Sequence, residues 1–292
     1  MENFVKIDRY YVSKLFPKRS ENSNKGTFGT VLNFAGSIYY PGAAFLSSLA
    51  ALRAGCGLVR LATESSVIPV IASQTPDVTY IDLGSNEFGT IPKDAHKIVK
   101  EIKAPSAIAV GCGLSALNPI KEFVPKLLKN YLESSIPVVI DADAINVLSV
   151  MENPPLPLNS VITPHPLELS RLIKVDAEQI QSDRLKWANY ASSKLDCIVI
   201  LKGHNTVISI PNGNTFVNTT GSSALAHGGT GDILCGMIAG FAAQGMKLED
   251  ASILAVYLHG RAGEIAGKKL SEYSVLASDV LKFVPFAIKE FF

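Results

Sequence analysis

The stretch AIAVGCGLSA, residues 107–116, runs from a short apolar segment through a glycine-rich turn toward a helical segment. A four-residue apolar run before such a turn is typical of a buried parallel strand that leads into a helix. The turn also fits the G-x-G-x-x-G/A pattern of dinucleotide-binding loops. Two interpretations remain open: a dinucleotide site of the Rossmann type, or a closely packed turn that contacts some other ligand.

Short β-rich segments alternate with helical segments on both sides of this stretch, which predicts βαβ units around a mostly parallel sheet. We expect strands at 31–35, 58–62, 79–83, 107–110, 138–141, 161–163, 197–201 and 206–210. We expect helices at 42–54, 93–102, 118–130, 166–173, 176–193, 232–244, 248–267 and 274–290. The turn at 211–214, Pro-Asn-Gly-Asn, predicts a hairpin at one edge of the sheet. Since no repeat or linker interrupts the pattern, we expect one domain over residues 1–292.

The composition excludes several classes of function. The 292 residues are 47% hydrophobic and carry 27 basic and 26 acidic side chains, and the basic residues do not cluster. A nucleic-acid surface is therefore not expected. The N-terminus lacks the apolar segment of a signal peptide, and the apolar runs are too short to span a membrane, so we expect a soluble cytoplasmic protein. The four cysteines form no CxxC pair, which favours buried, unpaired thiols over a zinc site or disulfides.

The segment GSSALAHGGTGDILCGMIAG, residues 221–240, places a glycine-dense loop before an apolar helix. The free N–H groups at such a helix start bind anions, and phosphate above all. Asp232 stands at the junction, where a carboxylate could deprotonate a hydroxyl that attacks phosphorus. The structural alternative is that Asp232 only caps the helix. The chain has no GxxxxGK[ST] string, so this is not a Walker-type loop.

Other polar residues follow the predicted strands, and in open α/β sheets ligands bind at the carboxyl ends of the strands. Asp141 and Asp143 suit Mg²⁺ or a ribose hydroxyl, although Asp143 could instead be a helix N-cap. His165 lies between two prolines and either faces a ligand or only marks the start of a helix. Glu168, on the first turn of that helix, could hold a metal-bound water. Lys202 either lies on a surface turn or faces phosphate.

The remaining histidines lack the spacing of metal ligands. His96, His204, His227 and His259 are interpreted as structural or solvent-facing.

Eight segments, in order from Lys25 to Gly240, resemble the NAD(P)HX dehydratase family of the ribokinase-like superfamily. They are KGTFGTVLNFAGS, PGAAFLSSLAALRAGCGLVRLAT, VGCGL, VIDADAIN, TPHPLEL, VILKGHNTVI, NTTG and GGTGDILCGMIAG. The resemblance implies a three-layer α/β/α fold with a central, mostly parallel sheet. The chain departs from the family pattern at Leu167, where glycine is usual, and at Ser222-Ser223-Ala224, where an Asn-Pro-Gly-like segment is usual.

The family repairs hydrated nicotinamide cofactors. ADP or ATP phosphorylates the ring hydroxyl of the S form of hydrated NADH or NADPH, and phosphate then leaves, which restores the reduced cofactor. By this resemblance Asp232 is the catalytic base and contacts the substrate. The same resemblance implies substrate contacts at Ala43, Gly113 and His165. It implies nucleotide contacts at Lys202, Gly203, His204, Asn205, Thr206 and Gly231.

The resemblance further implies Mg²⁺ as cofactor and a homotetramer, and Glu168 is the candidate metal ligand, through water, from its place on the helix. About twenty-five residues precede the first motif, so we expect a dehydratase without a fused epimerase domain that works beside a separate epimerase. The main alternative function is a ribokinase-like kinase of a small hydroxylated metabolite or vitamin precursor, which would release a stable phosphoester. A nucleotide-binding regulatory protein without catalysis is a second alternative, and the presence of Asp232 argues against it.

Overall fold

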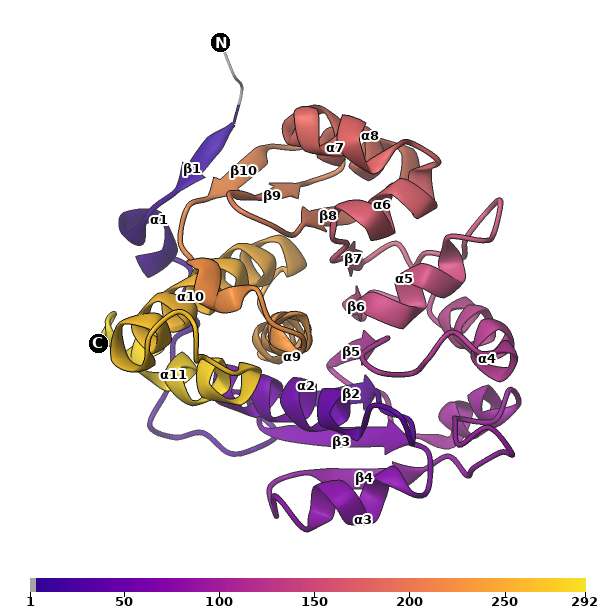
Figure 1. Ribbon diagram of the computed structural model, residues 1–292. Coiled ribbons are helices and arrows are strands. Elements are labelled where there is room, and N and C mark those ends of the chain that lie inside the picture. The colour runs from indigo at the N-terminus through magenta and orange to yellow at the C-terminus, as the bar shows by residue number, and fades with distance from the viewer. Residues whose placement is uncertain (1–3) are drawn as a thin grey trace.

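The computed structural model describes residues 4–292, and these residues form one ten-stranded sheet with helices on both faces (Figure 1). The strand order is β1-β10-β9-β8-β7-β6-β5-β2-β3-β4. The strands are β1 (Val5–Ile7), β2 (Thr30–Phe34), β3 (Leu58–Thr63), β4 (Thr79–Asp82), β5 (Ala107–Val110), β6 (Val138–Ile140), β7 (Ser160–Ile162), β8 (Ile198–Leu201), β9 (Thr206–Ser209) and β10 (Thr215–Asn218). All pairings are parallel except β8 with β9 and β9 with β10.

The helices form two layers, and Figure 1 shows the sheet curving around α9. On the inner side lie α2 (Pro41–Ala54), α9 (Thr230–Ala243), α10 (Leu248–Leu270) and α11 (Ala277–Lys289). On the other side lie α4 (Asn118–Lys129), α5 (Ala142–Leu148), α6 (Pro166–Ile173), α7 (Ala177–Ser182) and α8 (Arg184–Leu195). The shorter elements are α1 (Arg9–Ser13), α3 (Val67–Ala72) and the 3₁₀ helices η1 (Ala95–Glu101) and η2 (Ser223–Leu225).

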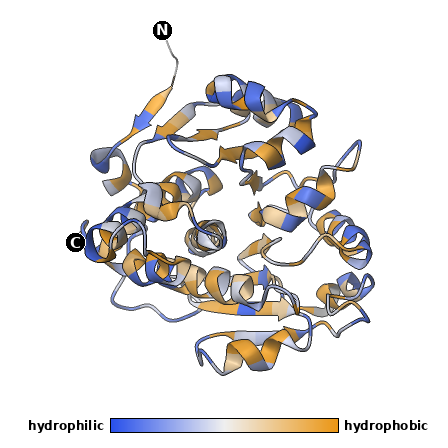
Figure 2. Cartoon of the chain, in the orientation of Figure 1, coloured by the Kyte–Doolittle hydropathy of each residue, from blue (hydrophilic) through white to orange (hydrophobic). Residues whose placement is uncertain are grey.

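Two hydrophobic cores, one on each face of the sheet, hold these layers together. Alternate residues of a strand point to opposite faces, and in β5 Ala107 and Ala109 pack in the core with α9 whereas Ile108 and Val110 pack in the other core. The central strands β5, β6 and β8 are accordingly wholly apolar, and the outer helices in Figure 2 carry polar residues toward solvent. The predicted three-layer α/β/α fold with a mostly parallel sheet is confirmed.

The central helix α9 packs against α2 through two glycines one turn apart. A Cβ on Gly236 would lie 2.1 Å from the carbonyl oxygen of Ser47, and one on Gly240 would lie 2.4 Å from that of Ala51. Since real atoms cannot approach so closely, a side chain at either position would separate the helices. This contact fixes the position of the amino end of α9 relative to the sheet.

Several elements differ from the expected pattern. The hairpin of β9 and β10 lies at the expected end of the sheet, but the short β1 pairs with β10 outside it. The single helix expected at 176–193 is two helices, because Asp183 accepts the N–H of Lys186 and starts α8 anew. The 93–102 segment is a 3₁₀ helix. A three-residue strand such as β1 depends on its distant partner, so no local periodicity indicates it.

Candidate active site

Asp232 is the third residue of α9, and its carboxylate is not used as a helix cap. The N-cap position belongs to Gly229, which has φ +93° and no side chain to offer. A Cβ on Gly229 would lie 2.7 Å from Leu46 Cδ1, so the loop approaches α2 closely. The N-cap interpretation of Asp232 is therefore wrong. The first N–H groups of the helix lack a side-chain cap, and the carboxylate stands beside them.

The surroundings of Asp232 favour its protonated form more than water does. Burial, together with the charge of Asp141, raises the pKa of the Asp232 carboxyl to about 7. The neighbouring Cys112 thiol and the Lys202 ammonium partly offset this rise in pKa. A carboxylate with a pKa near neutrality is well matched to accept a proton from a hydroxyl group.

Lys202 points inward from the end of β8, so the surface-turn interpretation is wrong. Its Nζ lies 2.8 Å from Asp141 Oδ1 and 3.8 Å from Glu168 Oε2. Although burial alone would lower the pKa of Lys202, these two carboxylates raise it above its usual value. A Cβ on Gly231 would lie 3.4 Å from Nζ, so the ammonium lies beside the amino end of α9. The site thus holds a permanent positive charge at the glycine-rich loop.

Asp141 and Asp143 connect the loops that follow β5, β6 and β7. Asp141 is the N-cap residue of α5 and accepts the Thr163 hydroxyl at 2.6 Å in addition to Lys202. Asp143 lies within the first turn of α5 and accepts the N–H of Ser115 at 2.7 Å. The interpretation of Asp143 as an N-cap is therefore wrong. Burial raises the pKa of Asp143, and the charge of Asp141 adds to this rise.

The 111–116 loop closes against the start of α2 rather than leading directly into a helix. Helix α4 begins only at Asn118, whereas Gly36 donates its N–H to the Cys112 carbonyl. Gly113 has φ +65°, and a Cβ there would lie 2.7 Å from the Cβ of Ala43. The structure therefore brings together two of the residues implied as substrate contacts. Of the two interpretations of this loop, the closely packed turn agrees with the geometry.

His165 and Glu168 form a capping box at the start of α6. The His165 Nδ1 accepts the N–H groups of Leu167 and Glu168 at 3.2 Å each, and Glu168 Oε2 accepts the His165 N–H at 2.8 Å. Burial lowers the pKa of His165, and the Lys202 charge adds to this effect. The ring is half-exposed, and its Nε2 lies 3.6 Å from Glu168 Oε1. Burial also raises the pKa of Glu168, against the effect of Lys202.

A cavity of about 630 Å³ opens beside the amino end of α9. Its wall includes Thr220, Leu225, Leu234, Val256 and His259 from the loops and helices around it. All six residues implied as nucleotide contacts line it too: Lys202, Gly203, His204, Asn205, Thr206 and Gly231. These six come from two segments that lie far apart in the sequence, and the fold brings them together around one space. Their individual roles remain predictions.

Comparison with known proteins places this geometry in a family. The NAD(P)H-hydrate dehydratase family model matches residues 31–285. The ADP-dependent (S)-NAD(P)H-hydrate dehydratase of Bacillus subtilis is 36% identical over 283 residues, which cover 96% of both chains. The crystal structure of the Bacillus subtilis ADP/ATP-dependent enzyme, co-crystallised with ATP/Mg²⁺, has a TM-score of 0.87 at 33% identity and covers both chains fully. The chain belongs to the NAD(P)H-hydrate dehydratase family. The predicted family and its dehydratase function are therefore confirmed.

The ribokinase-like fold of this dehydratase is confirmed by a ribokinase-like superfamily protein from Enterococcus faecalis, with a TM-score of 0.86 at 26% identity. Other relatives are longer: the bifunctional NAD(P)H-hydrate repair enzyme of Moorella thermoacetica is 36% identical, but the chain spans only 52% of its length. Within residues 4–292 of the dehydratase, no helix is both long and apolar enough to cross a membrane.

His259 of the dehydratase is a site residue that the sequence interpretation missed. Its ring is buried on α10, a backbone carbonyl of Thr230 accepts a hydrogen bond from it, and its Nε2 has no partner among the described residues. Burial lowers the pKa of His259 to about 4, so the ring is neutral and Nε2 is an acceptor. The position of His259 in the sequence does not indicate a place in the site, because only the fold brings α10 to the start of α9.

The departures from the family pattern also have a structural place in the dehydratase. Leu167 is half-exposed, and its N–H donates to His165 within the capping box. Ser222 accepts the Ala224 N–H at the start of η2, and Ser222 and Ser223 lie on the wall of the 630 Å³ cavity.

Proposed function

We propose that this chain uses ADP or ATP to dehydrate the S form of hydrated NADH and NADPH, with Asp232 as the base. The observation that carries this proposal is the free Asp232 carboxylate beside uncapped helix N–H groups and a nucleotide-sized cavity. The relative of matching length from Bacillus subtilis is an ADP-dependent (S)-NAD(P)H-hydrate dehydratase.

The first step is transfer of the terminal phosphoryl group to the ring hydroxyl. Asp232 accepts the hydroxyl proton while the oxygen attacks phosphorus, and the N–H groups at the start of α9 hold the transferred group. Lys202 supplies positive charge on the nucleotide side of the same helix end.

The second step is elimination. The carbon–oxygen bond breaks, its electron pair leaves with phosphate, and loss of a proton from the adjacent carbon restores the ring double bond. Phosphorylation is needed because phosphate is a far better leaving group than hydroxide.

The residues around the site fit a hydrated Mg²⁺ ion. Asp141, Asp143, Glu168 and Asp232 place four carboxyl groups around the single ammonium of Lys202, and their mutual repulsion contributes to the raised pKa values of Glu168 and Asp232. Within the described part of the chain, no three of these carboxylates lie close enough to chelate one ion directly. Glu168 would therefore hold Mg²⁺ through water, and the ion would supply charge neutralisation at the phosphates.

The nucleotide occupies the 630 Å³ cavity, with its phosphates toward Gly231 and Lys202. The wall of this cavity combines the apolar side chains of Leu225, Leu234 and Val256 with the unpaired acceptor Nε2 of His259. Such a combination suits a base that carries an amino donor. The hydrated dinucleotide lies on the other side of Asp232, against Ala43, Gly113 and the half-exposed ring of His165.

We further propose a homotetramer that acts in the cytoplasm beside a separate epimerase that interconverts the two forms of the hydrate. The existence of bifunctional repair enzymes among the relatives supports the functional link to an epimerase.

The test is a turnover assay with hydrated NADH and either ADP or ATP. We expect recovery of NADH, followed by its near-ultraviolet absorbance, with release of one phosphate per NADH. Accumulation of a stable phosphoester without NADH would contradict the proposal and favour the kinase alternative. A parallel assay with hydrated NADPH and with each nucleotide identifies the preferred pair.

A further inference from the structure

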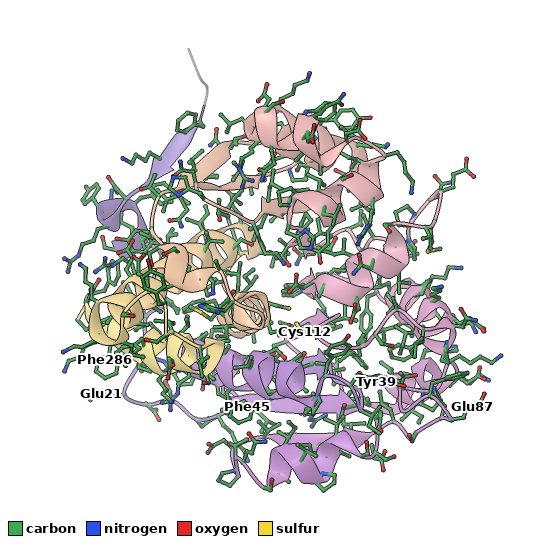
Figure 3. The ribbon with its side chains drawn as sticks, viewed as in Figure 1. Glu21, Tyr39, Phe45, Glu87, Cys112 and Phe286 are labelled. Atoms are coloured by element: carbon green, nitrogen blue, oxygen red, sulfur yellow. The ribbon has the colours of Figure 1, made fainter. Side chains whose placement is uncertain are left out.

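Two cysteines and one aspartate converge near Asp232. One ligand atom each from Cys112, Asp141 and Cys235 can be chosen so that all three atoms lie within 4.8 Å of one another. The three residues come from the loop after β5, the end of β6 and the second turn of α9, and all are buried. Figure 3 labels Cys112, which lies beside the end of α9. The residues that the structure describes contain one such cluster.

The proposed dehydration uses neither thiol, and it uses Asp141 only through its charge and the contacts of its Oδ1. Asp141 Oδ1 accepts Thr163 and Lys202, but the Cys112 thiol, at 3.9 Å, is the partner that faces Oδ2. The two sulfurs lie within 4.8 Å of each other. One carboxylate oxygen and two sulfurs are thus available to a ligand without breaking the Lys202–Asp141 ion pair.

Two sulfurs and carboxylate oxygen suit Zn²⁺ or Cd²⁺ and not Mg²⁺, because thiolates prefer soft or borderline cations and Mg²⁺ prefers oxygen. The candidate for a fourth ligand is the neighbouring Asp232 carboxylate, whose pKa is shifted by both Asp141 and Cys112, although Asp232 is not one of the three residues whose ligand atoms already lie within 4.8 Å of one another. Tetrahedral coordination by two sulfurs and two oxygens is an ordinary arrangement for Zn²⁺.

We propose that Cys112, Cys235 and Asp141, completed by Asp232, bind one thiophilic divalent cation, Zn²⁺ or Cd²⁺, and that the bound ion blocks the enzyme. Binding releases the two thiol protons to solvent and changes no oxidation state. A cation coordinated by Asp232 prevents this carboxylate from accepting the substrate proton. The inhibition rests on the proposed function, whereas the binding of the metal does not.

The chain offers matched controls for the two cysteines. Cys56 and Cys197 are also buried, but they precede β3 and β8 and so lie at the amino ends of the parallel strands, away from the site. Replacing either by alanine removes a buried thiol of the same kind without touching the cluster.

The first experiment titrates the reduced, metal-free full chain with CdCl₂ in the absence of nucleotide and follows the ultraviolet absorption of the cadmium–thiolate bond. We expect one Cd²⁺ per chain. Cys112→Ala and Cys235→Ala should each weaken binding at least about 100-fold, whereas Cys56→Ala and Cys197→Ala bind as the wild type does. Equal binding by all variants, or loss of binding in the control variants alone, would overturn the proposal.

A measurement on the wild type keeps the proposal testable if the variants fold poorly. X-ray absorption of the protein loaded with one Zn²⁺ should show two sulfur and two oxygen or nitrogen neighbours, and one sulfur or none would refute the site. In the turnover assay, preloading with Zn²⁺ should abolish the activity of the wild type and of Cys56→Ala. The same preloading should lower the activity of Cys235→Ala only slightly. Unchanged turnover of the metal-loaded wild type would exclude the inhibitory role. A protein that binds the metal but never converts hydrated NADH would instead refute the proposed function alone.

Discussion

Helices α6 and α9 start alike but use their acids differently. Each follows the carboxyl end of a strand region and carries an acid as its third residue, Glu168 in α6 and Asp232 in α9. In α6 the N-cap is His165, which accepts N–H groups with its ring while Glu168 accepts the His165 N–H. In α9 the N-cap is Gly229, which has no side chain, and no capping box forms.

The residue at the N-cap therefore decides whether the acid at the third position serves the helix or the chemistry. A side chain at the N-cap ties the acid into a reciprocal pair of hydrogen bonds. A glycine there leaves both the helix N–H groups and the carboxylate free for a ligand. Substitution of either acid should therefore have different consequences.

The largest expected effect is on turnover when the free acid is removed. Asp232→Asn should lower the rate about 10³-fold, because a positioned general base contributes a factor of this order. Nucleotide binding should persist, since the glycine loop and Lys202 remain. Turnover is followed by the absorbance of NADH and nucleotide binding by calorimetry. A rate within tenfold of the wild type would show that the carboxylate is not the base.

The second expected effect is on stability, because a raised pKa destabilises the folded protein when the acid ionises. The pKa of Asp232 rises from 3.8 in the unfolded chain to about 7 in the fold, so the folded state binds the proton more tightly. Wild-type stability should fall as the pH rises through this window. At pH 8 Asp232→Asn should be more stable than the wild type by a few kcal/mol, and at pH 4 the difference should vanish. Urea unfolding at both values measures this, and parallel behaviour of the two proteins would contradict it.

The third prediction concerns the pH profile of turnover. Since the base must be ionised, kcat/KM should fall about tenfold per pH unit below about pH 7. The charge of Asp141 contributes to the raised pKa of Asp232, so Asp141→Asn should move this acid limb to lower pH. Glu249→Gln on the distant start of α10 is a control that should leave the profile in place. An unmoved limb in Asp141→Asn would mean that burial alone sets the pKa.

The smallest expected effects lie at the start of α6. Glu168→Ala should cost about 1 kcal/mol of unfolding free energy, because the His165 N–H loses its partner in the capping box. Glu168→Gln keeps an acceptor and should cost less than half as much, while it weakens the dependence of turnover on Mg²⁺. Chemical denaturation and a magnesium titration separate the two roles. Equal stability loss in both variants would show that the charge of Glu168, and not its hydrogen bond, stabilises the helix.

Local patterns predicted the layers of the fold and the general position of the site. The alternation of short apolar segments with helical segments predicted the bounds of most strands within one or two residues. Strands and helices that pack on a core carry apolar residues at different spacings, so the two are distinguishable in the sequence. The residues of the candidate site lie in the loops after the strands, since parallel strands bring their carboxyl ends to one edge. Wrong interpretations arose where a side chain had two local uses, as with Asp143 and Asp232 as helix caps. Local sequence cannot distinguish a cap from a free carboxylate, because the neighbour that takes the hydrogen bond decides.

Sequence alone determined that this chain is an α/β protein of the NAD(P)H-hydrate dehydratase family with an acid behind a glycine loop, since motif order and periodicity are properties of the linear chain. Tertiary structure decided which polar groups meet. Lys202 meets Asp141, Cys112 lies near Cys235, and the unpaired Nε2 of His259 lies on the wall of the cavity beside α9. In each case the residues come from elements remote in sequence. Electrostatic shifts and metal chelation depend on distances of a few ångströms between such groups, and packing of the two helix layers onto the sheet sets these distances.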